Sequence, residues 1–307
     1  MRVASIDLGS NSFLCLIADV DSSGKVTVID DMAEVVRLGQ GVGEVGFICE
    51  EALLRASSCL QKFANQIHKF KPLKVFAVAT AAARNAKNVD DLIKLASEFG
   101  IPVKVITGQL EAELTFRGSI AGRTNSGNNI VIDIGGGSTE IIIGSPKEII
   151  YRKSFNIGVV KIREKFVKTF PINKDTFFLI RKEIIEEFRQ LETEYLKGVV
   201  NVIAVAGTPT TLASILLGGY DPLKIEGYFI NSKALETWQN TLLELTPSDI
   251  EEKFFVQKGR SDVLAIGVIM LCEILKMIEK NGINVSIQGL RYGLAEMIAN
   301  KEYENES

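Results

Sequence analysis

The sequence has little of what many enzymes and metal proteins are built from. Histidine occurs once, as His68 in a helical stretch, so a histidine-centred triad or a histidine-rich metal site has little to build on. A surface position is expected for it. The four cysteines form no C-x-x-C pair, and their apolar or helical surroundings favour reduced core thiols over a disulfide framework or a metal site. If the protein needs a general base, a carboxylate is the expected source.

Long apolar runs and a strong net charge are also missing. The longest apolar run, at 263–272, has ten residues. This is about half of a membrane span and predicts a buried helix. Asp7 falls where the apolar part of a secretory signal would begin, so a cytoplasmic protein with no membrane partner is expected. The net charge of -3 gives no reason to expect nucleic acid as a partner, and a polyanion would have to meet a local cluster of Lys and Arg.

What is present is the composition of a globular protein. The chain has 307 residues, of which 46% are hydrophobic and 24% charged, which suits two domains better than one core. The polar stretch GRTNSGNN at 122–129 is the clearest linker. The sequence therefore predicts one domain over 1–121, joined by a closing helix at 292–307, and a second domain over 122–291.

Hydrophobic periodicity predicts a mixed α/β fold in which both halves begin with a β-hairpin of similar chemistry. Such an internal duplication would place the halves face to face across a cleft that closes on substrate. Strands are expected at 2–7, 12–20, 26–37, 74–80, 102–107, 130–134, 138–144, 147–155, 200–206 and 284–288, and helices at 50–70, 90–99, 108–122, 157–168 and 175–197, from 207 and from 292.

The two hairpins share a plan. VASIDLGSNSFLCLIADV (3–20) and VIDIGGGSTEIIIG (131–144) each interrupt an apolar run with a polar, Gly-containing turn. Glycine would allow the positive φ of a tight turn, which explains Gly9, Gly135, Gly136 and Gly137 by structure alone. Three glycines in a row exceed that need, and they would also let backbone N–H groups approach an anion closely. Short donors stand at the same turns: Ser10, Asn11, Ser12, Ser138 and Thr139.

An aspartate ends the first strand of each hairpin. Asp7 and Asp133 would repel a phosphate ligand unless a cation lay between them. Mg²⁺, or another divalent cation, is the natural choice, because it is held by one or two carboxylates, waters and phosphate oxygens. The alternative is that each aspartate only caps its own turn. The equivalent positions of the pair favour the metal.

A third loop, AVAGTPTTLAS at 204–214, is read as a strand, a turn and a helix start. Pro209 suits the first helical turn, and Thr208 or Thr210 could cap it. The exposed N–H groups from Gly207 onward would form an anion site. A well-capped structural helix is about as good an explanation.

These three loops resemble those of the actin, sugar-kinase and Hsp70-like ATPase superfamily. The details resemble one branch, the exopolyphosphatase/guanosine pentaphosphate phosphohydrolase family. The resemblance rests on six blocks in order: DLGSNS, ATAAARNAKN (79–88), TGQLEAEL (107–114), DIGGGSTE, GRSDVLAIG (259–267) and GLRYGLAEM (289–297). It implies a two-domain fold of duplicated ribonuclease H-like domains. The chain departs from the family pattern at Leu110 and Tyr292, and it resembles the short form of the family, for which no C-terminal HD-type domain is expected.

The resemblance also assigns roles. It implies that Glu111 is the catalytic glutamate, although a first-turn helix residue is the plainer explanation from the sequence alone. Glu140 would orient water or help hold the metal, or else be a solvent-facing strand residue. Arg84 is the phosphate-binding arginine that the family places there. Weaker arginine candidates, in or near loops, are Arg260, Arg291 and Arg37.

The implied activity is hydrolysis of the terminal phosphate of inorganic polyphosphate or guanosine pentaphosphate, with guanosine tetraphosphate as a possible ligand. Attack by water with metal assistance would release orthophosphate, in a monomer or homodimer. Two other functions stay open: an ATP-dependent small-molecule kinase of the same fold, and a non-catalytic binder of polyphosphate or alarmone.

Overall fold

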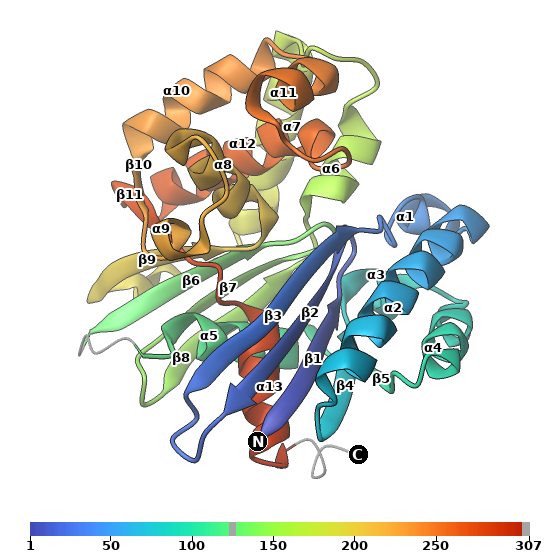
Figure 1. The fold of residues 1–307 in the computed structure, drawn as a ribbon. Coiled ribbons are helices and arrows are strands. Elements are labelled where there is room, and N and C mark those ends of the chain that lie inside the picture. Colours follow the sequence, from blue (N-terminus) through green and yellow to red (C-terminus); the bar gives the residue numbers. More distant parts are fainter. Residues whose placement is uncertain (123–126, 303–307) are drawn as a thin grey trace. The chain divides into compact units, whose positions relative to one another are not determined.

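The computed structural model describes residues 1–122 and 127–302 (Figure 1). The chain divides into two compact units, one made of 1–124 with 288–307 and the other of 125–287. The sequence places these divisions at 121/122 and 291/292. The predicted linker at 122–129 lies partly outside the described residues, and its last two positions, Asn128 and Asn129, already belong to a strand. The Asn129 side chain accepts a hydrogen bond from Asn201 at 3.2 Å, which fixes Asn129 against the parallel strand that contains Asn201.

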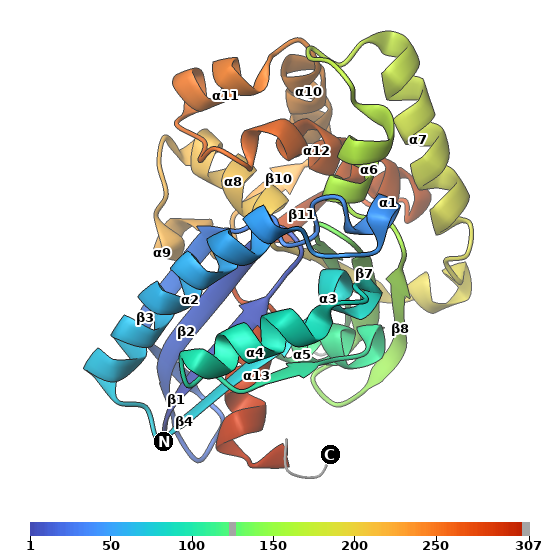
Figure 2. The ribbon, with the colours of Figure 1, turned by 90° about the vertical axis from the view of Figure 1, so that its right-hand side faces the viewer.

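The first unit is built on a five-stranded sheet in the order β3-β2-β1-β4-β5. Helices cover both faces of this sheet (Figure 2). They do so because the central strands direct apolar side chains to both faces. One face packs on α2 and α4, and the other on α13 and α5. The elements are β1 (Arg2–Leu8), β2 (Ser12–Val20), β3 (Val26–Val35), α1 (Val42–Val45), α2 (Glu50–Phe70), β4 (Lys74–Ala79), α3 (Ala81–Asn85), α4 (Val89–Glu98), β5 (Val103–Val105), α5 (Gly108–Ile120) and α13 (Leu290–Ala299).

The second unit repeats this sheet and adds a strand. Its order is β10-β11-β9-β6-β7-β8. In both units the three hairpin strands are antiparallel and the next two run parallel to the first. The elements are β6 (Asn128–Ile134), β7 (Thr139–Gly144), β8 (Ile149–Phe155), α6 (Val159–Phe166), α7 (Lys174–Phe188), η1 (Thr193–Leu196), β9 (Val199–Val205), α8 (Gly207–Leu217), α9 (Pro222–Ile225), β10 (Phe229–Asn231), α10 (Ser232–Leu243), α11 (Pro247–Phe254), α12 (Ser261–Met277) and β11 (Gly282–Val285).

The structure confirms the α/β fold and its duplication, and it corrects three boundaries. The predicted helix 175–197 ends at Phe188, and one 3₁₀ turn follows after an extended Glu192. This break lets Tyr195 pack on Tyr151 of β8, with ring centroids 5.2 Å apart. The predicted strand 284–288 is β11, which ends at Val285, and α13 begins at Leu290 rather than at 292.

The structure confirms the buried helix and the surface histidine that the sequence predicts. The apolar run at 263–272 is the buried centre of α12. No helix in the described ranges is long and apolar enough to cross a membrane. All four cysteines are free thiols, three of them buried, and His68 is exposed.

Candidate functional site

The candidate site residues of the first unit lie at one edge of its sheet. β1, β4 and β5 are parallel and in register, so the segments that follow them meet at the carboxyl ends of the strands. These segments are the turn 9–12, the helix α3 with Arg84 and the start of α5 with Glu111. The Ser10 hydroxyl accepts a hydrogen bond from the N–H of Ala82 at 3.1 Å. This bond ties the turn to α3.

The turns of the two hairpins have the same hydrogen bond. Gly9 donates its N–H to the Ser12 carbonyl at 3.2 Å, and Gly135 donates to the Ser138 carbonyl at 3.0 Å. The proposed explanation by positive φ is wrong for these glycines and for 136–137, all of which lie in the described part of the chain. A Cβ at Gly9 would stand 2.8 Å from the Ser12 oxygen, and one at Gly135 would stand 3.0 Å from that of Ser138. Glycine is needed because each turn folds its own carbonyl back onto that position.

Helix α6 fixes the orientation of the glycine-rich turn. Its first N–H groups donate to the carbonyls of Gly135 and Gly136, at 3.0 and 2.9 Å. Because a trans peptide points its N–H opposite to its C=O, the N–H groups of Gly136 and Gly137 point away from α6. Within 1–122 and 127–302, no backbone carbonyl accepts from these two groups. A Cβ at Gly158 would lie 2.5 Å from the Gly136 carbonyl carbon, so helix and turn fit closely.

The side chain of Thr139 supports the turn and does not have the position expected of a phosphate-binding residue. Its side chain is fully buried, and its hydroxyl donates to the Ile157 carbonyl at 2.7 Å. The hydroxyl hydrogen is therefore engaged in bracing the turn rather than directed at a ligand. Ser138 is also buried, with 5% of its surface exposed.

Asp133, Glu140 and Ser154 form a row across β6, β7 and β8. Asp133 pairs with Glu140 and Glu140 with Ser154 in the antiparallel register, so the three side chains share one face. Glu140 is only 1% exposed, so its alternative as a solvent-facing residue is wrong. The Ser154 hydroxyl donates to Glu140 Oε1 at 2.7 Å. Asp7 holds the place of Asp133 in the first unit, where its cross-strand partner is Leu14.

The carboxylate pair has the composition of a magnesium site but not of a closed metal cage. In the part of the chain that the structure describes, no three His, Cys, Asp or Glu residues gather closely enough to hold a metal on their own. Mg²⁺ ordinarily takes one or two protein carboxylates and completes its shell with waters and phosphate oxygens. Asp133 with Glu140 fits that donor set, since they are direct cross-strand neighbours.

Arg84 and Glu111 are joined by a short ion pair. Arg84 Nη1 lies 2.6 Å from Glu111 Oε2 and also donates to the Ile106 carbonyl at 3.1 Å. The side chain of Glu111 is 10% exposed and that of Arg84 is 23% exposed. Glu111 follows Thr107, whose hydroxyl caps α5 by accepting from the Leu110 N–H at 3.2 Å. The glutamate therefore does more than occupy a first helical turn.

Burial raises the pKa of the Glu111 carboxyl above its ordinary value, and the charge and hydrogen bond of Arg84 oppose that rise. A carboxylate with a raised pKa is a stronger base than an exposed one. Oε2 is held by Arg84, whereas no described residue donates a hydrogen bond to Oε1. Oε1 is therefore the oxygen available to a water proton.

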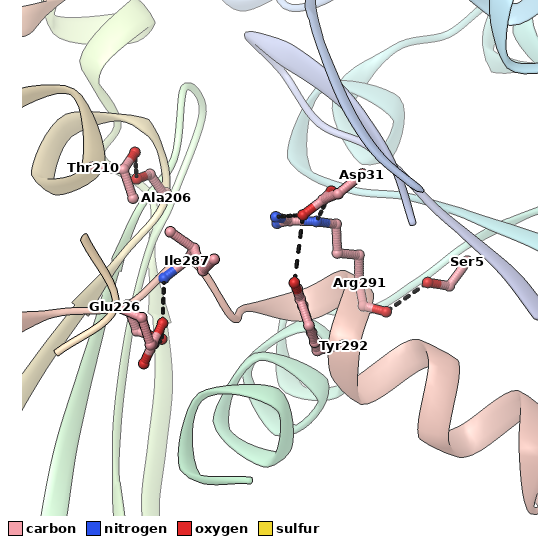
Figure 3. A network of polar contacts seen from close by, with 9 residues as sticks. Ser5, Asp31, Ala206, Thr210, Glu226, Ile287, Arg291 and Tyr292 are labelled. Carbon is pink, nitrogen blue, oxygen red and sulfur yellow. Dashed lines mark hydrogen bonds and ion pairs between the residues drawn. The ribbon is translucent and has the colours of Figure 1, made fainter. Parts of the chain in front are cut away.

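The third loop is strained where the strand becomes a helix. Ala206 has φ 73 and ψ -167, a region that residues other than glycine rarely enter and that costs about 1–3 kcal/mol. The predicted capping of α8 by Thr208 or Thr210 is wrong, because Ala206 occupies the cap position and no side chain bonds there. Thr210 instead donates its hydroxyl to the Ala206 carbonyl at 2.8 Å (Figure 3). The first N–H groups of α8 are left uncapped, as the anion-site alternative requires.

Arg260 belongs with this third loop. Its Nη1 lies 3.8 Å from where a Gly207 Cβ would stand. Thr208 is buried, with 6% of its surface exposed, and a Cβ at Gly267 would lie 2.1 Å from its hydroxyl oxygen. The side chain of Thr208 thus packs on α12, which leaves its backbone as the part that could meet a ligand.

The contacts of Arg291 are those of a structural residue rather than of a phosphate ligand. It is the second residue of α13, not a loop residue as expected, and its Nε and Nη2 each lie 2.8 Å from the Asp31 carboxylate (Figure 3). Its carbonyl accepts from the Ser5 hydroxyl at 2.6 Å. These contacts fasten α13 to β1 and β3. Arg37, which follows β3 with φ 54, accepts from Arg55 Nη2 through its carbonyl at 3.4 Å.

Sequence reasoning did not single out Ser154, Ala206 or Glu226. Ser154 is found only through the strand register, and Ala206 only through its backbone angles. Glu226 accepts from the hydroxyl of Ser286 and from the N–H of Ile287, the latter at 2.9 Å, where β11 ends (Figure 3). None of these contacts has a signal in residue spacing.

Comparisons with known proteins agree with the geometry. Residues 16–302 match the Ppx/GppA phosphatase family. Exopolyphosphatase 2 of Mycobacterium tuberculosis is 31% identical, with 97% of this chain and 98% of that protein covered. Guanosine-5'-triphosphate,3'-diphosphate pyrophosphatase of Vibrio parahaemolyticus is 30% identical, and the match covers 99% of this chain and 60% of that protein.

A solved structure gives the same result. The crystal structure of the Ppx/GppA family member of Aquifex aeolicus superposes with a TM-score of 0.81 at 30% identity, with 98% of each chain covered. The family match and the fold therefore agree over nearly the whole chain. The chain belongs to the Ppx/GppA phosphatase family.

Proposed function

We propose that the protein hydrolyses the terminal phosphoanhydride of inorganic polyphosphate or of guanosine pentaphosphate and releases orthophosphate. The carrying observation is the buried Glu111, one of whose oxygens is held by Arg84 at 2.6 Å while the other is not engaged by any described residue. The names of the relatives support both substrates. The two ligands share the terminal phosphoanhydride on which such a site would act.

In this reaction a water attacks the terminal phosphorus, and Glu111 accepts the water proton as the bond forms. The attack displaces the next phosphate as the leaving group. Backbone N–H groups of Gly136 and Gly137, with those at the start of α8, would bind phosphoryl oxygens. Ser10, Asn11 and Ser12 would do the same from the first hairpin. Mg²⁺ would neutralise phosphate charge when bound: Asp133 would hold it in the second unit with help from Glu140, and Asp7 is the candidate carboxylate of the first unit.

The proposal extends to the surroundings of the protein. Orthophosphate release from guanosine pentaphosphate would place the enzyme in the stringent response, and the four free cysteines suit the reducing cytoplasm. A monomer or homodimer would suffice for this chemistry. Neither nucleic acid nor membrane is needed as a partner.

The test is phosphate release from polyphosphate and, separately, from guanosine pentaphosphate. Glu111→Gln removes the proton acceptor and keeps the size, so turnover should fall by roughly 10²–10⁴-fold. The matched control is Glu113→Gln on the same helix, because Glu113 pairs with Arg117 at 2.8 Å and not with Arg84. Near-normal turnover of Glu111→Gln would exclude it as the base. Product formed only with ATP and an acceptor would indicate a kinase, and binding without turnover a sensor.

A further inference from the structure

The side chain of Arg84 is only partly used by the protein. Both of its hydrogen bonds come from one nitrogen, Nη1, to Glu111 and to the Ile106 carbonyl. Among residues 1–122 and 127–302, none accepts from Nε or Nη2. A guanidinium has five N–H donors in a rigid fork, and that fork matches two acceptors on different edges at once.

The position of Arg84 decides what its other nitrogens can meet. It lies in α3, at the carboxyl end of β4, and α3 is tied through Ala82 to the Ser10 hydroxyl of the first hairpin turn. One edge of the Arg84 guanidinium is thus bound to Glu111. The backbone of Arg84 belongs to α3, the helix that contacts the first hairpin turn.

We propose that Arg84 is a positioning residue as well as a phosphate ligand: Nη1 holds Glu111 in place while Nε or Nη2 takes a phosphoryl oxygen, so that substrate binding and base alignment are coupled. This inference rests on the proposed function. It adds that a bound phosphoryl group competes with Glu111 for the charge of Arg84. Bound substrate therefore makes Glu111 more basic, while the hydrogen bond from Nη1 keeps the carboxylate in place.

The electrostatics support this coupling. Arg84 is the charged side chain, among the described residues, whose field and hydrogen bond act on Glu111, and both oppose the rise in pKa caused by burial. A phosphoryl charge on Arg84 would weaken that opposition and make Glu111 more basic. Without Arg84, Glu111 would keep its burial and lose what favours its ionised form.

The test is a double-mutant cycle on the whole protein, with polyphosphate as substrate. The variants are Arg84→Gln, Glu111→Gln and the double variant, and kcat, KM and the pH profile of kcat/KM are measured. Arg84→Gln should raise KM and also move the acid limb of the profile to higher pH. In kcat, the double variant should be no worse than Glu111→Gln by more than about threefold, because Arg84 acts partly through Glu111.

Two further variants keep the result interpretable. Arg84→Lys keeps the charge but lacks the fork, so it should restore binding of polyphosphate better than it restores kcat. Arg2→Gln is the control, because Arg2 also pairs with a carboxylate, Asp19, at 3.0 Å but on an exposed surface. It should leave kcat, KM and the pH profile unchanged.

The outcomes separate this inference from the proposed function. If the wild type releases phosphate, and Arg84→Gln raises KM with an unmoved acid limb and with losses in kcat that multiply with those of Glu111→Gln, Arg84 only binds phosphate and the coupling is wrong. If the wild type releases no phosphate from either substrate, the proposed function fails first.

Discussion

Two buried glutamates in this chain each have one carboxylate oxygen held by a neighbouring side chain. Glu111 is held by Arg84 and Glu140 by Ser154. The two partners differ in charge. An arginine stabilises the ionised carboxylate strongly, whereas a hydroxyl donates one hydrogen bond and orients the group with less effect on its charge. The arginine thus favours the ionised form of Glu111, which is the form that can accept a proton, and the hydroxyl keeps Glu140 in a fixed direction beside Asp133.

We expect Ser154→Ala to lower kcat with little change in KM. The variant removes the donor that lies 2.7 Å from Oε1 of the buried Glu140 carboxylate. A hydrogen bond to a charged group contributes about 1.5–3 kcal/mol, so the loss in kcat should be roughly tenfold or more. Ser154→Thr keeps the hydroxyl on a strand position and should restore most of the rate.

Steady-state kinetics and thermal unfolding of these variants are measured together. Ser145→Ala is the control, because Ser145 lies in a turn after β7 and its hydroxyl accepts from the Lys147 N–H at 3.3 Å and from no other described residue. If Ser154→Ala loses stability but keeps its kcat, the contact is structural and Glu140 needs no fixed direction.

At the scale of elements, hydrophobic periodicity and turn chemistry are enough to predict the two hairpins and the buried helix α12. Both hairpin turns were placed correctly because a polar turn between apolar runs has few other solutions. What failed depended on tertiary contacts. The end of α7 follows from the packing of Tyr195 on Tyr151, and α8 starts without a side-chain cap because Ala206, with its strained backbone, occupies the cap position. The Arg84–Glu111 pair joins positions 27 apart in the chain, so no local pattern predicts its geometry.

The crossing of α5 and α13 depends on glycine at the contact. A Cβ at Gly118 would lie 2.2 Å from the Gly289 carbonyl oxygen, and one at Gly293 would lie 2.0 Å from that of Leu114. Both neighbours are backbone atoms, which cannot move aside as a side-chain tip can. Since α5 also carries Glu111, the helix crossing sets the position of the candidate base.

We therefore expect Gly118→Ala to destabilise the protein and to lower turnover. Overpacking of this kind costs about 1–3 kcal/mol, or more where the backbone must shift. Gly43→Ala is the control, because Gly43 lies in α1 without positive φ and a Cβ there meets nothing within 4 Å. Chemical denaturation and kcat are measured for both. Unchanged stability of Gly118→Ala would show that the two helices can separate at no cost.

At the scale of the whole molecule, the two units are built differently along the chain. The second is one continuous stretch, 125–287, whereas the first joins 1–124 to the returning segment 288–307. The returning helix α13 is part of a core cluster with residues of β1, β2 and β4. Its contribution consists of Leu290, Tyr292, Leu294, Ala295, Met297 and Ile298.

This difference predicts that the second unit folds alone and that residues 1–124 do not. Burying a Leu, Ile or Met side chain contributes about 1.5–3 kcal/mol, so the four such residues of α13 represent about 6–12 kcal/mol. That is comparable to the whole stability of a typical domain. Without α13, the face of the sheet formed by Val3, Leu16 and Ala18 would also be exposed.

The measurement is thermal and urea unfolding of three proteins: 125–287, 1–124, and 1–124 mixed with a peptide of 288–302. The first should unfold cooperatively. The second should show no cooperative transition, and the peptide should restore one. A peptide with Leu294→Asp is the matched control and should fail, because it places a charge at a fully buried position. Cooperative unfolding of 1–124 by itself would show that α13 only covers a unit that is already complete.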